Sequence, residues 1–264
     1  MLGKLLKYDM KNLGASMIPM YLCLAVIVVI DRIIQMLRKI DALSRIPAVG
    51  YIANTTHILS AVGVIILFVM LLILGILYYR NNIMGDQGYL MHTLPVTSYQ
   101  LVASKVITVL SYVVITTIVS YFVLAVSIGK LFWGKKVYMD FLYFMGESKA
   151  ICIIIVFSVY FLICFMYLLM VAYLAFSIAY SSNTKHRNIA AGAIFLIMYI
   201  IGKCGELAVV FGLFCMGITD MDLEKIDVSE ILYLCIPLII IYLALVVVSY
   251  LLAGRWLQKR LNID

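Results

Sequence analysis

The chain has 264 residues, of which 66% are hydrophobic and only 12% are charged. Soluble domains carry about 25% charged residues, so this composition excludes a soluble protein and indicates an integral membrane protein. The basic residues behind the net charge of +7 flank apolar runs, which favours a lipid bilayer with anionic headgroups as the partner and argues against nucleic acid.

Six apolar runs are long enough to cross a membrane, since about 20 helical residues span a hydrocarbon core of about 30 Å. The runs are apolar on every face, which excludes the short alternating strands of a membrane barrel. We therefore expect an all-α integral membrane protein with a single transmembrane domain, residues 1–264. The expected spans cover residues 17–37, 57–84, 97–129, 151–180, 188–203 and 231–254.

Residues 1–14 predict an amphipathic helix before the first span. At about 100° per residue the leucines fall on one stripe and the lysines on the opposite stripe, which consists of Lys4, Lys7 and Lys11. Such a helix lies flat on the membrane with its lysines toward the headgroups, and Pro19 suits the turn into the span. A cleaved signal peptide is the alternative, but no small-residue cleavage site precedes the span.

The orientation of the chain follows if this amphipathic helix lies in the cytoplasm. Both termini, and the segment between the second and third spans, are then cytoplasmic. Lysine and arginine divide evenly between the two sides in this arrangement. The positive-inside rule therefore does not decide the orientation by itself.

The second span is longer than a bilayer requires. A helix over residues 57–84 would measure about 42 Å at about 1.5 Å per residue, so its end protrudes into the cytoplasm. Tyr78, Tyr79 and Arg80 are expected at the membrane surface, where amphipathic rings and cations collect. Gly85 is expected to end the helix in a left-handed conformation.

Residues 86–96 then predict a short cytoplasmic helix. Asp86 can cap its start, Pro95 stops it, and Thr97 with Gln100 forms a capping box that begins the third span. The apolar residues of this short helix are Tyr89, Leu90 and Leu94. Apolar side chains exposed on a rigid helix suggest a docking site for a partner protein. A plain loop packed on its own helices is the alternative.

The sequence "GDQGYLMHTLPVTSYQLVASK", residues 85–105, resembles the segment between the second and third spans of permease subunits of ABC-2 type transporters. In that family an acidic residue precedes a glycine, an aromatic residue and a leucine, Leu-Pro follows, and a lysine opens the next span. The matching residues are Asp86, Gly88, Tyr89, Leu90, Leu94, Pro95 and Lys105. Asp86 stands where glutamate is commoner, which preserves both the charge and the capping.

The resemblance implies that residues 85–96 form a coupling helix seated in a cleft of a cytoplasmic ATPase subunit, and that residues 1–14 form the elbow helix. It implies an exporter of the bacterial plasma membrane with two permease copies and two ATPases. ATP and Mg would bind to the partner ATPase, since no GxxxxGK[ST] phosphate loop occurs in this sequence. We expect no cofactor and no enzymatic activity on this chain.

The fifth apolar run, residues 188–218, is too long for one upright span. The motif "GKCGE" within it predicts a break, after which the chain would re-enter the outer leaflet before the sixth span. Similar re-entrant helices occur in the transporters that the chain resembles.

Four charged residues in the outer part of the spans form a candidate pathway site. A rise of about 1.5 Å per residue places Lys203 at a height similar to that of Asp31 and Arg32. Charges in a membrane are costly unless they are paired or hydrated. One hypothesis is a polar collar formed by these residues with Glu206, and the alternative is that Lys203 and Glu206 simply neutralise each other.

Cysteine and histidine give no sign of a metal site. The three histidines lie far apart, at His57, His92 and His186. No CxxC spacing occurs, and every cysteine falls in an apolar run. We therefore interpret the cysteines as small core residues, namely Cys23, Cys152, Cys164, Cys204, Cys215 and Cys235.

The leading functional hypothesis is the transmembrane subunit of an ATP-driven exporter for hydrophobic or amphipathic cargo, such as a peptide, an antimicrobial peptide or a drug. A membrane-embedded protease or acyltransferase is one alternative, although the acids inside the spans lie beside cations rather than in a catalytic set. A sensor or immunity subunit that binds peptide without transport is the other.

Overall fold

The computed structural model describes residues 2–37, 47–85, 97–128, 148–182, 186–215 and 228–261. All elements in these ranges are helices, and six of them are long and apolar enough to cross a membrane. The predicted all-α class with six potential spans is thus confirmed. The elements are α1 (Leu2–Leu37), α3 (Pro47–Tyr79), the π-helix η1 (Arg80–Met84), α5 (Ser98–Ile128), α7 (Ser148–Ser181), α8 (Arg187–Cys215) and α9 (Val228–Leu261).

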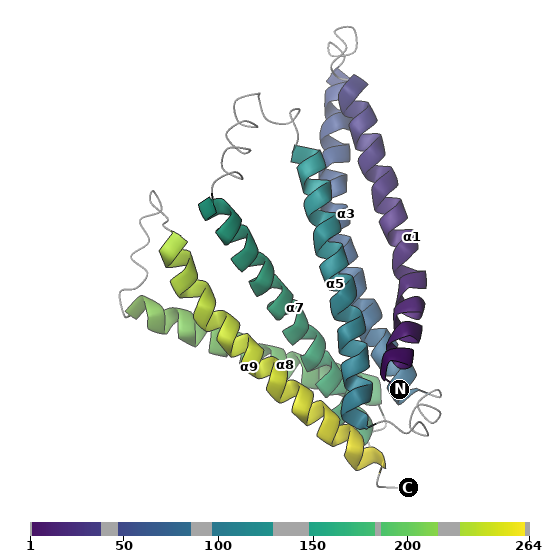
Figure 1. The fold of residues 1–264 in the computed structure, drawn as a ribbon, viewed down its shortest axis with the longest axis vertical. Coiled ribbons are helices and arrows are strands. Elements are labelled where there is room, and N and C mark those ends of the chain that lie inside the picture. The colour runs from purple at the N-terminus through teal and green to yellow at the C-terminus, as the bar shows by residue number, and fades with distance from the viewer. Residues whose placement is uncertain are drawn as a thin grey trace.

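The helices form two groups that meet at one end and diverge toward the other (Figure 1). In the first group α1 packs against α3 and α5, and in the second α7 packs against α8 and α9. Contacts of α5 with α9, and of α3 and α5 with α7, join the two groups. The start of α1 and the end of α9 lie at the end where the groups meet (Figure 1), as an even number of spans requires.

α1 is one continuous helix, so the predicted separation between residues 1–14 and a span starting at residue 17 is wrong. Pro19 lies inside the helix rather than at a turn. A proline removes one backbone hydrogen bond from a helix, and membrane helices tolerate it where neighbouring helices restore the lost contacts. The amphipathic pattern itself holds, because Leu13 is buried and the three lysines of the predicted stripe are exposed.

α3 begins at Pro47, well before the predicted start of the second span at residue 57. Two threonines before that point contact carbonyls of the preceding turn. The hydroxyl of Thr55 donates to the carbonyl of Ile52 at 2.9 Å, and Thr56 Oγ1 lies 3.1 Å from the carbonyl oxygen of Ala53. Hydroxyls satisfied within the helix in this way allow a polar stretch to remain helical.

α8 is also continuous, so the break predicted in "GKCGE" is wrong, and so is the span end at residue 203. Gly202 serves packing instead, because a Cβ there would overlap the hydroxyl of Tyr167 from α7. That hydroxyl donates to the carbonyl of Met198 at 3.2 Å. α8 runs at a wide angle to α5 (Figure 1), so counting residues along α8 overestimates the height of Lys203 in the bundle.

A close contact between α5 and α9 joins the two helix groups. A Cβ at Gly254 would lie 2.2 Å from the ring of Tyr99, so the ring occupies the space that a larger residue would fill. The hydroxyl of Tyr250, one turn earlier on α9, donates to the carbonyl of Tyr99 at 2.9 Å. Small residues let membrane helices approach in this way.

Replacing Gly254 with alanine should therefore push α9 away from α5. Overpacking of this kind costs about 1–3 kcal/mol, which should lower the temperature at which the purified protein loses a single size-exclusion peak after heating. Gly192→Ala is the matched control, because nothing lies within 4 Å of a Cβ there. Equal melting of the two variants would contradict the proposed contact.

Candidate functional site

The predicted coupling residues lie outside the described part of the chain, since the structure describes the chain up to residue 85 and again from residue 97. They are Asp86, Gly88, Tyr89, Leu90, Leu94 and Pro95. The structure does describe the helix end before this segment and the helix start after it.

The helix that leads into the segment ends as a buried π-helix. In η1, the side chains of Asn82, Ile83 and Met84 are buried. Gly85 follows with extended backbone, at φ −86° and ψ −168°, so the predicted left-handed helix end is wrong. π-Helical turns are rare and are frequently found at functional sites.

Tyr79, which the sequence predicts at the membrane surface, is fully buried between helices. Its ring stacks on that of Tyr173 from α7, with centroids 3.9 Å apart and planes 10° apart. Its hydroxyl shares a hydrogen bond of 2.7 Å with Ser177, also on α7. The end of α3 is therefore attached to the second helix group just before the segment.

The helix that leaves the segment begins with the predicted capping box, which is confirmed. The backbone N–H of Thr97 donates to Gln100 Oε1 at 3.2 Å, and the N–H of Gln100 donates to Thr97 Oγ1 at 3.4 Å. Leu101 and Val102, in the first turn of α5, are buried. The start of α5 is thus both capped and packed.

A buried ion pair ties this part of α5 to the N-terminal part of α1. Lys105 Nζ donates to Asp9 Oδ1 at 2.6 Å, and the two side chains are 0% and 2% exposed. The hydroxyl of Tyr78 on α3 donates to the same oxygen at 2.8 Å, and the ammonium lies 4.4 Å from the centre of the Tyr78 ring. One carboxylate therefore connects α1, α3 and α5.

Sequence reasoning did not predict this ion pair, although a signal was present. Asp9 lies one helical turn after Leu5 and one turn before Leu13, so it sits within the apolar stripe opposite the lysines. Lys105 likewise lies one turn after the buried Leu101 on the inner face of α5. An acid and a base on apolar faces predict a buried pair, because an isolated buried charge is costly.

A second buried carboxylate lies toward the other end of α1. Asp31 is 0% exposed, and Gln35 Nε2 donates to its two oxygens at 3.0 and 2.9 Å. From α3, the hydroxyl of Thr56 donates to Asp31 Oδ1 at 3.0 Å, and His57 Nδ1 lies 3.9 Å from Asp31 Oδ2. This cluster joins α1 to α3.

Lys203 and Glu206 belong to a third cluster, between α7, α8 and α9. Lys203 Nζ donates to Glu206 Oε2 at 2.5 Å and to the hydroxyl of Tyr242 at 3.2 Å. Tyr242 in turn donates to Glu206 Oε2 at 2.5 Å, and Tyr160 donates to Glu206 Oε1 at 3.0 Å. The predicted pairing of the two charges is confirmed.

The four candidate collar residues therefore fall into two places within one chain. Asp31, with its neighbour Arg32, lies on α1 beside α3, whereas Lys203 and Glu206 contact α7 and α9. Their assembly into one collar in a dimer stays a prediction.

Histidine and cysteine form no metal-ligand set in the described ranges, where no group of three or more His, Cys, Asp or Glu residues comes together. His92 lies outside these ranges. All six cysteines are free thiols, as expected, but none is fully buried, so their interpretation as core residues is wrong. Four of them are exposed, namely Cys23, Cys152, Cys204 and Cys215.

Comparison with known proteins returns no match: no family model fits the chain, and neither the curated proteins nor the solved structures yield a significant hit.

Removing Lys105 should destabilise the protein strongly, because Asp9 would remain buried without its cation. Breaking a buried pair from one side costs about 3–5 kcal/mol. We expect Lys105→Met to lower the melting temperature of the purified protein in detergent far more than the double variant Asp9→Asn with Lys105→Met. A double variant as unstable as the sum of the two single variants would show that the two side chains act independently.

Proposed function

We propose that this chain is the transmembrane subunit of an ABC-2 type exporter. It moves hydrophobic or amphipathic cargo out across the bacterial plasma membrane, as one of two permease copies. A separate cytoplasmic subunit hydrolyses ATP with Mg. The chain itself is not an enzyme in this proposal, and both of its termini are cytoplasmic.

The observation that carries this proposal is the contact made by the last residue of the family-like motif. Lys105 follows the matched residues 86–95 and binds Asp9 in the interior of the bundle. A lysine at this place therefore has a physical role, which is to fix the helix after the coupling segment to α1. Tyr78 on the preceding helix binds the same carboxylate, so the helices before and after the segment are joined at one point.

Such an anchor suits the transmission of force. When ATP closes the partner ATPases, a push on residues 86–96 enters α3 and α5 together, and the ion pair makes α1 move with them. Packed helices joined in this way move as a rigid body. The stack of Tyr79 on Tyr173 then passes the displacement to α7, and thus toward the second helix group.

The apolar surface of the bundle suits the proposed class of cargo. Side chains of α8 and α9 such as Leu207, Phe211 and Ile240 are largely exposed, while polar groups are gathered in the few clusters described above. A path between two such subunits would have apolar walls with a thin polar lining.

The proposed docking of an ATPase can be tested by co-purification. Replacing Tyr89 and Leu94 with aspartate should abolish capture of a co-expressed ABC ATPase subunit, because charges would replace the apolar groups that are proposed to dock in its cleft. The readout is the ratio of the two chains after affinity purification from solubilised membranes.

Tyr51→Asp is the matched control for that experiment. Tyr51 is an aromatic residue that is 72% exposed, and it lies near the start of α3, far along the chain from the coupling segment. Its variant should retain the ATPase. Capture that survives in the Tyr89 and Leu94 variant would refute the proposed coupling helix.

If the proposed polar collar lines the transport pathway, removing its charges should reduce export without lowering stability. Replacing Lys203 with methionine and Glu206 with glutamine removes both charges together, so neither is left unpaired. We expect reduced ATP-dependent uptake of cargo into inverted membrane vesicles, with a melting temperature close to that of the wild type. A double variant that exports normally and melts normally would refute a role for the pair in the pathway.

A further inference from the structure

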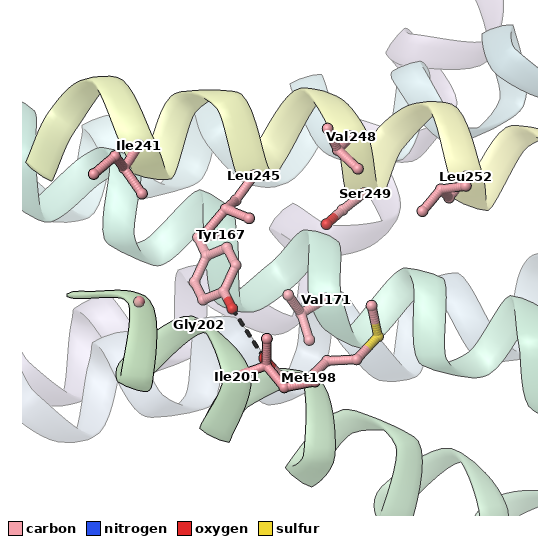
Figure 2. Close-up of a pocket in the computed structure, with 11 residues that line it drawn as sticks. Tyr167, Val171, Met198, Ile201, Gly202, Ile241, Leu245, Val248, Ser249 and Leu252 are labelled. Carbon is pink, nitrogen blue, oxygen red and sulfur yellow. Dashed lines mark hydrogen bonds between the residues drawn. The ribbon is translucent and has the colours of Figure 1, made fainter. Parts of the chain in front are cut away.

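A cavity of about 330 Å³ lies between α7, α8 and α9. Its wall is mostly aliphatic, with side chains such as Val171, Ile201 and Leu245 around the ring of Tyr167 (Figure 2). Ser249 contributes a hydroxyl, and that of Tyr167 is already bound to a backbone carbonyl. Ligand-binding cavities measure about 300–1,000 Å³, so this one suits a small apolar group such as a single alkyl chain.

The cavity is open toward the side of the bundle. α7 packs extensively against both α8 and α9, whereas those two helices contact each other little. Two residues of the wall, Ile201 on α8 and Val248 on α9, are 65% and 51% exposed. The cavity is therefore a crevice between α8 and α9 with α7 as its floor, and in a membrane its mouth faces the acyl chains.

The Lys203 cluster borders one end of this crevice. On α8, Gly202 and Gly205 line the cavity and directly precede the two charged residues of the cluster. Between α7 and α9, the ring of Tyr167 in the cavity wall packs against that of Tyr242 in the cluster, with centroids 5.1 Å apart. The cluster thus lies beside the crevice, next to the ring of Tyr167 in its wall.

Within this cluster, the group with an unused hydrogen-bond donor is the ammonium of Lys203. Both oxygens of Glu206 accept hydrogen bonds, from three donors in total. An ammonium has three N–H donors, and in the described residues Lys203 uses two, for Glu206 and Tyr242. Its side chain is 45% exposed. A partly exposed cation in an apolar span is costly without a further acceptor.

We propose that this crevice binds a single-chain anionic amphipath, a long-chain carboxylate of the fatty-acid type. The alkyl chain occupies the cavity between α8 and α9, and the carboxylate accepts a hydrogen bond from Lys203 Nζ. This inference does not rest on the proposed function, because such binding needs neither an ATPase nor transport.

Photolabelling of the full chain in phosphatidylcholine nanodiscs tests the proposal. The probe is palmitic acid that carries a diazirine in its chain, and the labelled peptides are mapped by mass spectrometry. We expect labels on the α8 and α9 peptides that contain Ile201 and Val248. Excess palmitate should displace the probe at about tenfold lower concentration than palmityl alcohol, because only the carboxylate makes a charge-assisted hydrogen bond.

Filling the crevice provides the first variant. A Cβ at Gly205 meets nothing within 4 Å, so Gly205→Leu should place its side chain in the open cavity without displacing its neighbours. We expect labelling to fall about tenfold. Gly192→Leu is the matched control, since Gly192 lies on the same helix, also has open space at its Cβ and does not line the cavity.

Removing the charge provides the second variant. Lys203→Met combined with Glu206→Gln should weaken palmitate competition about tenfold, whereas Glu206→Gln alone keeps the ammonium and should retain it. Each variant is first checked for a single size-exclusion peak.

Three results would overturn the proposal. The first is equal competition by palmitate and palmityl alcohol, and the second is labelling that is unchanged in Gly205→Leu. The third is a crevice that stays unlabelled until the purified assembly is dissociated into single chains, because a second copy of the protein would then be its occupant.

Discussion

The arrangement of the first helix group depends on the buried carboxylate of Asp9. Moving an ion pair out of water costs several kcal/mol per charge, and that cost is offset only while Lys105 and Tyr78 stay in place. The three side chains come from α5, α3 and α1. Any arrangement that separates these helices leaves a charge without a partner, so the first helix group behaves as one unit where it meets the second.

Within the described residues, the second helix group is held together by hydrogen bonds and close packing rather than by a buried ion pair between helices. Its helices meet through tyrosine hydroxyls that bond to backbone carbonyls or to Glu206, with glycines such as Gly202 leaving room for the rings. Apolar burial stabilises such contacts little in a membrane, where lipid tails are as apolar as the side chains that they replace. Close packing and hydrogen bonds remain, which is why α8 can lie at a wide angle with a crevice beside it.

Much of the architecture is predictable from local patterns. Apolar length gave the six spans, and the pair of Thr97 and Gln100 gave the start of α5, because both depend only on neighbours in sequence. The errors arose where tertiary contacts override local preference. Gly202 lies in the predicted helix break but is a packing site. The position of Asp9 on the apolar stripe requires a cation, and that cation, Lys105, is distant in the sequence.

The register of α1 against α3 has a consequence for how the first helix group can deform. Twenty-two residues separate Asp9 from Asp31, and the same number separates their partners Thr56 and Tyr78 on the antiparallel helix. The two contacts lie about 33 Å apart along the helix, so longitudinal sliding by even one residue would break both. Bending is not restricted in this way, and Pro19 lies between the two fixed points. α1 is therefore a strut that can flex at its middle but cannot shift along its own axis.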